Sequence, residues 1–180
     1  MAASHEASRQ LDRQAPEMFL KIQGLNGEST DFEYRDWSEI ISFSWSVKQP
    51  AGSAGGLGQG GAGSSERADF SDFTVAKAVD KLSPTLVVYC ARGQHIKEVK
   101  VSIRRPIEKQ RLYQITLEDA VVSGVSQVAQ PGGFAGWLPV ESVSFTYSKI
   151  RFEYTECDHT TSRAKGAHRG DWDLKANKMI

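Results

Sequence analysis

The sequence predicts a mainly β protein: a small barrel of two packed β-sheets with one short flanking α-helix at about residues 84–92. Large and small residues alternate over several short segments, as in strands with one buried face. Start and stop signals for a helix flank residues 84–92. Along residues 139–154 the apolar positions change parity, which indicates a strand that passes from one sheet to another at a bulge or corner.

Length and charge limit the protein class. A chain of 180 residues fits one domain, and we expect a single barrel domain over residues 18–180 after a flexible polar leader, residues 1–17. Lys plus Arg and Asp plus Glu both total 22, a balance that does not favour a nucleic-acid or membrane-surface partner. The longest apolar run, residues 86–91, is far below the roughly 20 residues of a membrane span. The charged leader predicts no secretory signal.

The first strands come before a proline. Residues 18–23 predict a strand that ends at Gly24 and the Asn26-Gly27 turn. The next predicted strand alternates four large residues, expected in the core, with three serines: Ile41, Phe43, Trp45 and Val47 against Ser42, Ser44 and Ser46. The serine face is suited to a channel lining or a close neighbour, and an ordinary solvated face is the alternative. Pro50 ends this strand.

A glycine-rich segment follows. Seven of the twelve residues from Gly52 to Gly63 are glycine, so the segment offers too little side-chain surface to offset its ordering entropy. We therefore expect a long loop over residues 50–68. It lacks the Gly-Lys-Ser/Thr ending of a phosphate-binding loop. Two alternatives remain: a disordered loop, or a loop that becomes ordered against a neighbouring molecule.

The second half combines the helix with further strands. Residues 70–76 predict a strand. The helix has Ser83 as N-cap, Pro84 at its first position and Gly93 as its stop. Residues 98–104 alternate as a strand and residues 105–110 form a turn. Residues 112–128 supply one or two strands with Gly124 as a bulge or bend, and residues 130–136 form a second loop.

Reactive side chains form no catalytic or metal motif that the sequence reveals, and we predict no catalytic residue, cofactor or metal. Cys90 and His95 would suit a nucleophile and base, but Cys90 lies on the apolar helix face, which favours a buried thiol. Cys157-Asp158-His159 with His168 lacks standard ligand spacing. A hydrolase that uses Cys90 or Cys157 remains an alternative.

Charged and aromatic residues of the second half suggest contacts between copies. Arg104, Arg105, Lys109 and Arg111 form a basic turn, expected as a solvated hairpin tip or as the partner of Glu118-Asp119 in another subunit. Trp172 stands in a polar tail, so we expect it to dock on its own barrel or on a neighbour.

Several blocks, in this order and spacing, resemble the Hcp (haemolysin-coregulated protein) family of type VI secretion. They are Met18-Phe-Leu-Lys-Ile with Gly27-Glu-Ser, Phe43-Ser-Trp-Ser, the glycine-rich loop, Asp80-Lys-Leu-Ser-Pro-Thr-Leu, Gly93-Gln-His, Val101-Ser-Ile-Arg-Arg, Val143-Ser-Phe-Thr-Tyr-Ser-Lys-Ile, Glu153-Tyr and Asp171-Trp-Asp-Leu-Lys-Ala-Asn-Lys. The leader of 17 residues and residues 134–138 depart from the family pattern.

The resemblance implies a non-enzymatic tube protein. It implies homo-hexameric rings that stack into a tube inside a contractile sheath, with a spike protein at the tip and effector proteins in the lumen. The protein would be made in the bacterial cytoplasm and secreted without a cleaved signal peptide. The serines at 42, 44 and 46 would face the lumen. The ring-stacking residues would be Pro50, Gly52, Gly55, Gly56, Leu57, Gly58, Gly60, Gly61 and Gly63, and the subunit interface would include Arg104, Arg105, Glu118, Asp119 and Trp172. A monomeric small-ligand-binding β-barrel carrier is the alternative.

Overall fold

The computed structural model describes residues 15–50, 67–106, 109–129, 138–157 and 164–180. Most of the polar leader, the glycine-rich segment after Pro50 and the loop at 130–136 lie outside the described residues, so those predictions remain untested. The described residues form twelve strands and one helix, which confirms a mainly β fold. The elements are β1 Glu17–Ile22, β2 Ser38–Glu39, β3 Ser42–Ser44, β4 Val47–Lys48, β5 Asp69–Phe70, β6 Phe73–Ala78, α2 Ser83–Arg92, β7 His95–Arg104, β8 Arg111–Val128, β9 Val140–Thr146, β10 Lys149–Cys157, β11 Ala164–Asp173 and β12 Lys178–Met179.

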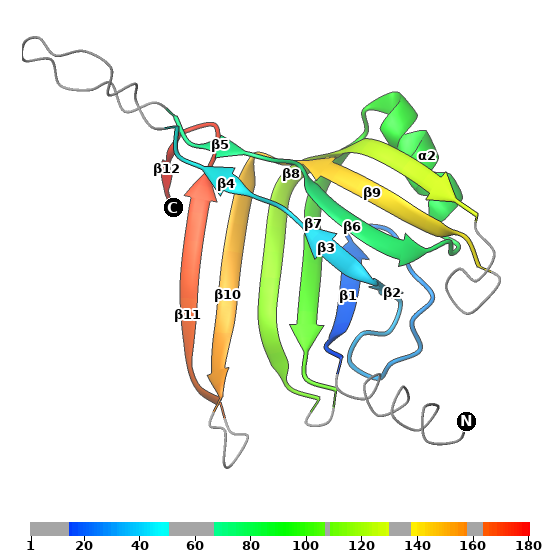
Figure 1. Ribbon diagram of the computed structural model, residues 1–180, viewed down its shortest axis with the longest axis horizontal. Coiled ribbons are helices and arrows are strands. Elements are labelled where there is room, and N and C mark those ends of the chain that lie inside the picture. The colour runs from blue at the N-terminus through cyan, green and yellow to red at the C-terminus, as the bar shows by residue number, and fades with distance from the viewer. Residues whose placement is uncertain (1–14, 51–66, 107–108, 130–137, 158–163) are drawn as a thin grey trace, which may run out of the picture.

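Antiparallel pairing closes a circuit of strands. From β1 the pairing runs through β7, β8, β9 and β6 to β3. β3 continues from β2, which pairs with β1 on the other side. Two backbone bonds complete this junction, from Ile40 N–H to Met18 C=O at 3.0 Å and from Ile41 N–H to Ala76 C=O at 2.7 Å. The circuit encloses the core, and β10 to β12 extend the sheet outward as a wing beside β8 (Figure 1).

The long strand β8 turns a corner. Its residues 113–118 pair with β10 and its residues 121–128 pair with β9. At the corner Asp119 has φ 51°, a left-handed conformation that Asp tolerates better than most side chains. β9 and β10 are separated opposite this point by Tyr147 and Ser148. The structure thus confirms a corner as the cause of the parity change in residues 139–154. A register shift between Val122 and Gly124 confirms the predicted bulge.

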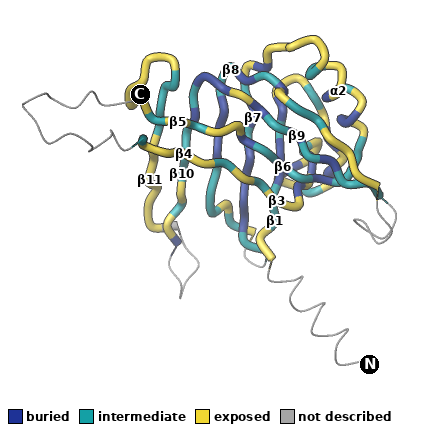
Figure 2. Tube along the Cα trace, turned by 45° about the horizontal axis from the view of Figure 1, so that its top comes forward, coloured by how far each residue is buried: buried dark blue, intermediate teal, exposed yellow. Residues whose placement is uncertain are grey.

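The core lies inside the circuit, where β1, β6, β7, β8 and β9 each contribute buried residues (Figure 2). Phe73 and Phe145 are fully buried, and the half-buried Phe43 stacks on Phe73 with centroids 5.6 Å apart. The prediction of core positions was wrong for Ile41 and Val47, whose exposed fractions are 40% and 47%. For Val47 the reason is that the chain leaves the barrel after β3 and crosses toward the wing as β4, which pairs with β5. Ile41 lies at the junction between β2 and β3, at the end of the barrel.

Helix α2 differs from its prediction at its start. Ser83, predicted as the N-cap, is the first helical residue, and its buried hydroxyl donates a hydrogen bond to Glu141 at 2.7 Å instead of capping the helix. Gly93 ends the helix with φ 59°, as predicted. Leu86 is buried, whereas the next residue, Val87, is 47% exposed. No helix of the described residues is long and apolar enough to cross a membrane.

A buried ion pair lies beneath the start of the helix. The Lys77 ammonium is 2.8 Å from Glu141 and 2.7 Å from Asp80, and the side chains of Lys77 and Glu141 are fully buried. Glu141 also accepts hydrogen bonds from Ser83 and from Gln127, the latter at 2.9 Å. Burying these charges is costly, and it is tolerated because each has close partners. The pair therefore fixes the positions of β6, β9 and the start of α2 relative to one another.

Arg104 lies inside the fold rather than at the predicted solvated tip. Its side chain is 2% exposed and binds three carboxylates of its own chain, those of Glu17, Asp31 and Glu33. Its guanidinium also lies 5.0 Å from the ring centre of Phe19, which stacks on the loop residue Tyr34. The basic turn is therefore not a free cationic tip at this position. Arg104 instead ties the chain between β1 and β2 to the end of β7.

We predict that Glu141→Gln lowers the free energy of unfolding by about 3 kcal/mol, because it leaves the buried Lys77 without a charged partner on β9. Combined with Lys77→Met, the two costs should be non-additive by at least about 1 kcal/mol. Urea unfolding followed by tryptophan fluorescence measures both quantities. Glu98→Gln is the matched control, because its pair with Lys100 is one-third exposed and should contribute under about 1 kcal/mol. Equal losses at the two sites would contradict the prediction.

The hydrogen bond from Arg104, partly offset by desolvation and helped by the Tyr34 and Glu33 amides, lowers the pKa of Asp31 to about 2 from 3.8. A lowered pKa adds stability that is complete above the unfolded value and disappears as the pH falls through the folded value. Asp31→Asn should therefore destabilise the protein by about 1–3 kcal/mol at pH 7. The difference from the wild type should shrink between about pH 4 and pH 2. Thermal unfolding across this range is the measurement, and a pH-independent difference would contradict the assignment.

Candidate functional site

A continuous patch of small, mostly hydroxyl side chains covers the outer face of four barrel strands. Direct cross-strand partners share a face, so the register defines two rows across β3, β6, β9 and β8. We call this patch the hydroxyl face. Its first row is Ser44, Thr74, Ser144 and Gly124, and its second row is Ser42, Ala76, Ser142 and Ser126.

The hydroxyl face is neutral and shallow. None of its eight residues carries a charge, and none has a side chain larger than threonine. Thr74 and Ser144 hydroxyls hydrogen-bond each other at 2.8 Å, whereas Ser42 and Ser44 are exposed. The intervening positions, including Phe73 and Phe145, point into the core. The strands therefore bury large apolar residues on one side and present a smooth hydrogen-bonding surface on the other.

The outer surface on the wing side of β8 is charged, in contrast to the neutral hydroxyl face. Here β7, β8, β10 and β11 carry charged side chains that pair within the chain. Arg151 on β10 binds Asp171 on β11 at 2.9 Å and Glu118 on β8 at 3.3 Å. Arg169 binds Glu153 at 3.0 Å. The outer surface is thus divided into a neutral part and a charged part.

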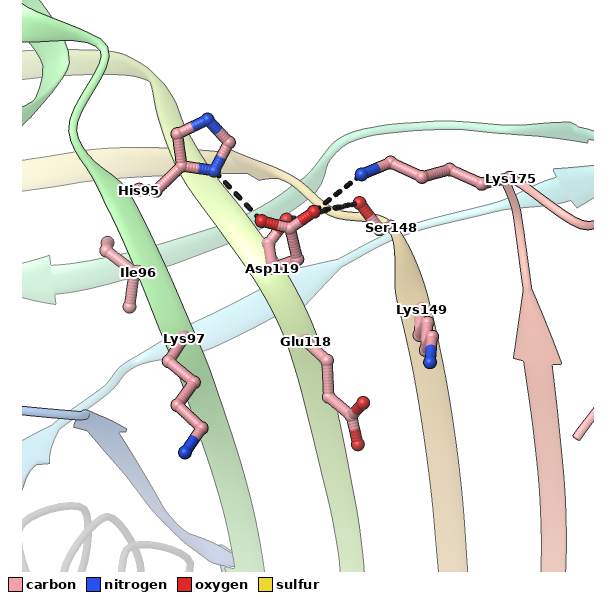
Figure 3. A pocket seen from close by; sticks show the side chains of 8 residues that line it. All are labelled: His95, Ile96, Lys97, Glu118, Asp119, Ser148, Lys149 and Lys175. Carbon is pink, nitrogen blue, oxygen red and sulfur yellow. Dashed lines mark hydrogen bonds and ion pairs between the residues drawn. The ribbon is translucent and has the colours of Figure 1, made fainter.

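A polar cluster marks the corner between these two surfaces. Asp119 accepts hydrogen bonds from Ser148 at 2.7 Å and Lys175 at 2.6 Å, and its other oxygen lies 2.9 Å from His95 Nδ1 (Figure 3). Bonds from Lys175, Ser148 and His95, in that order of effect, hold the pKa of Asp119 well below its usual range. The cluster borders an open depression of about 560 Å³ that also includes Lys97. Through the bond between Lys175 and Asp119, the cluster joins the C-terminal segment to the corner.

This cluster holds the residue types of a serine hydrolase but not their geometry. Ser148 donates to Asp119 rather than to His95, so no base is placed to activate the serine hydroxyl. His95 is paired with Asp119 and not with Cys90, its candidate nucleophile in the sequence. Cys157 is buried, with its thiol 3.5 Å from the Thr155 carbonyl. The arrangement of these described side chains supports a structural role better than nucleophilic catalysis.

The candidate metal ligands are only partly described. Asp158 and His159 lie outside the described residues, while His168 lies 3.4 Å from Glu156. Among the described residues no group of three potential ligands could hold a metal ion.

The predicted interface residues have partners in their own chain. Arg104 and Asp119 are engaged as described above, and Glu118 pairs with Arg151. Trp172 is half-buried and stacks on Phe70 with centroids 6.4 Å apart, so it docks on its own chain, one of the two alternatives expected. Arg105 also has a partner in the chain. A contact of these residues with a second copy stays a prediction.

Sequence reasoning found only one edge of the hydroxyl face. Ser42 and Ser44 belong to it, while Ser46 lies at its margin, where its N–H donates to Ser71 Oγ at 2.8 Å. Thr74, Ser126, Ser142 and Ser144 were missed. Alternation marks Ser142 and Ser144 as one face of a strand, but only the register shows that they lie in the same rows as Ser42 and Ser44, with β6 between them.

Comparisons with known proteins agree with this architecture. The family model "Type VI secretion system effector, Hcp" matches residues 19–154. Protein hcp1 of Pseudomonas aeruginosa is 28% identical over 166 residues, which cover 91% of this chain and 98% of that protein. The crystal structure of Hcp1 from Salmonella typhimurium has a TM-score of 0.74 at 28% identity, covering 92% of this chain and 99% of that one. A structure described as a type six secretion system protein has a TM-score of 0.81 at 24% identity, covering 92% and 100%. This chain belongs to the Hcp family of type VI secretion proteins.

Proposed function

We propose that this chain is the structural subunit of a type VI secretion tube. Six copies close into a ring, rings stack, and the hydroxyl face lines the lumen, where effector proteins are carried. One observation carries the proposal: the hydroxyl face spans a four-stranded layer, and among the described strands its end strands, β3 and residues 122–128 of β8, each pair along one edge only. The spike protein and the contractile sheath are the expected partners, and the route is from the bacterial cytoplasm to the outside.

The open edges explain why copies would join side by side. β3 pairs with β6 along one edge, and no described strand pairs with residues 42–44 along the other edge. At the far end of the layer, residues 122–128 of β8 pair with β9 only, as far as the described strands extend. Unpaired strand edges are templates for pairing with another chain. Pairing of β3 with the next copy's β8 would repeat one heterologous contact around a ring and continue the hydroxyl face without a break.

The chemistry of the hydroxyl face suits a carrier of varied cargo. Hydroxyl groups both donate and accept hydrogen bonds, so they accommodate many partner surfaces. The small side chains leave the bore open. This surface therefore supports transport without the enclosed site that catalysis requires.

The carrier-barrel alternative is disfavoured by the interior of the barrel. Large side chains, including Phe73, Phe145 and Leu20, fill it and are fully buried. A small-ligand carrier of this size needs an enclosed cavity in that position. The interior instead has the packing of an ordinary core.

We predict that the purified chain forms hexamers with an annular outline. Light scattering coupled to size-exclusion chromatography measures the mass, which should be about six times the chain mass of 19.8 kDa. Negative-stain microscopy shows the outline. A chain that stays monomeric at high concentration, with no annular particles, would refute the proposed function.

We predict that Ser44→Gln reduces effector retention by at least about fivefold, because the longer side chain projects into the lumen and displaces cargo contacts worth about 1 kcal/mol. Ser144→Gln should act in the same direction. Retention is measured by co-purification of an effector with assembled rings, and hexamer mass should be unchanged. Thr155→Gln on the wing is the matched control and should retain effector normally. Loss of rings, or normal retention in both serine variants, would count against the lumen assignment.

A further inference from the structure

An apolar pocket with an acidic rim opens at the end of the barrel where β1, β2 and β6 meet. Its volume is about 610 Å³. We call it the acidic pocket. Its apolar lining includes Met18, Ile40, Ile41, Val79 and Leu138, and its charged lining residues are Glu28, Glu39 and Asp80. Ile41 is 40% exposed, so the apolar lining is open to a partner.

The charges of the acidic pocket have one sign. Its described lining includes no Lys, Arg or His. Asp80 is neutralised within the chain by Lys77 at 2.7 Å, and Glu28 accepts a hydrogen bond from the Lys81 N–H at 2.8 Å. Glu39 is exposed on the rim. An occupant that matches this chemistry has an exposed apolar residue next to a cation.

The opposite end of the molecule presents such a segment. Met179 is 74% exposed and Ile180 is 56% exposed, directly after Lys178. Phe70 stacks on Trp172, which brings the β4–β5 ribbon and its exposed Val47 beside this segment. Lys178 lies opposite Asp173 in the β11–β12 pairing, and Lys48 lies opposite Asp69. We call residues 178–180 the basic end. Figure 1 shows the C-terminus at the left, far from β1, β2 and the end of β6, which carry residues that line the acidic pocket.

Phe32 is a poorer match for the pocket, although it is 98% exposed. It lies between Asp31 and Glu33, both bound to Arg104. Those two carboxylates would face the acidic rim of the pocket. Like charges brought together in this way oppose docking.

We propose that the acidic pocket of one copy receives the basic end of a second copy, so that Lys178 meets Glu39 and Met179 covers Ile41. The two surfaces lie at opposite ends of one molecule, so a chain cannot satisfy its own pocket. A contact between unlike ends repeats in one direction and builds a polar stack. This inference rests on the proposed function and adds its axial contact: open strand edges join copies within a ring, and the basic end joins one ring to the next.

Each such contact is small and becomes effective by repetition. One exposed ion pair and two apolar side chains give a weak association when a single pair of copies meets. Six contacts act together when two rings meet. The stack should therefore disperse with rising salt, because the rim charges are exposed to solvent.

Disulfide trapping tests the contact directly in the full-length chain. Ile41→Cys and Met179→Cys are prepared separately, mixed under mild oxidation and examined on a non-reducing gel. A disulfide-linked dimer is expected from the mixture. As a control, each cysteine variant is mixed with wild-type protein instead of with the other variant. This mixture reveals any disulfide formed with the native cysteines, of which Cys90 is half-buried and Cys157 is buried. A dimer that forms equally in the controls, or no dimer in the mixture, would overturn the inference.

Charge reversal gives a second measurement that does not depend on cysteine chemistry. Glu39→Lys and Lys178→Glu should each raise the concentration at which stacks disperse by at least about tenfold, because all six contacts of a ring junction change together, as followed by sedimentation velocity. The double variant should return toward the wild-type value. If the chain forms hexamers, but neither charge reversal changes the concentration at which stacks disperse and no specific disulfide forms, the axial contact alone would be overturned. A wild-type chain without hexamers would overturn it together with the proposed function.

Discussion

The constraint on which the structure depends is that one strand, β8, runs through both the barrel layer and the wing of a single bent sheet. Its eighteen residues pair first with β7 and β10 and then with β9. The buried positions change parity along the way, from Ile115 and Leu117 to Ala120 and Val122. The neighbouring segment of the same chain changes parity as well, between β9 and β10. Two adjacent strands therefore turn one corner together, and the left-handed backbone of Asp119 lies at that corner.

The corner also separates two kinds of outer surface. Before it, β8 contributes Glu118 to the charged face, where Arg151 on β10 is its partner. After it, β8 contributes Gly124 and Ser126 to the hydroxyl face. Because the same strands continue through both surfaces, the core packing of one supports the other. The cluster of Asp119 with Ser148 and Lys175 ties the C-terminal segment to this boundary.

Sequence patterns predicted those features of the fold that depend on neighbouring residues along the chain. The Gly93 stop, the bulge at Gly124 and the corner in residues 139–154 follow from backbone freedom and alternation, and the structure has each of them. Alternation could not show that Val47 leaves the barrel, because an exposed ribbon and a buried strand have the same period. It also could not show the burial of Arg104, since the three carboxylates that neutralise it come from β1 and the chain after it. The hydroxyl face depended on register for the same reason.

In the proposed ring of identical copies, the neutrality of the hydroxyl face has a physical reason. Any charge placed on it would appear six times around a narrow bore and again in every stacked ring. Like charges held at short distance in a confined space repel one another, with little water to screen them. A charged lining would therefore oppose ring closure and bind only cargo of the opposite sign. On the outer wing the chain does use charge, but Arg151 and Glu153 find their partners on neighbouring strands, so repetition there adds no net repulsion. In the proposed ring, symmetry thus favours small hydroxyl groups at the positions that would face the common axis.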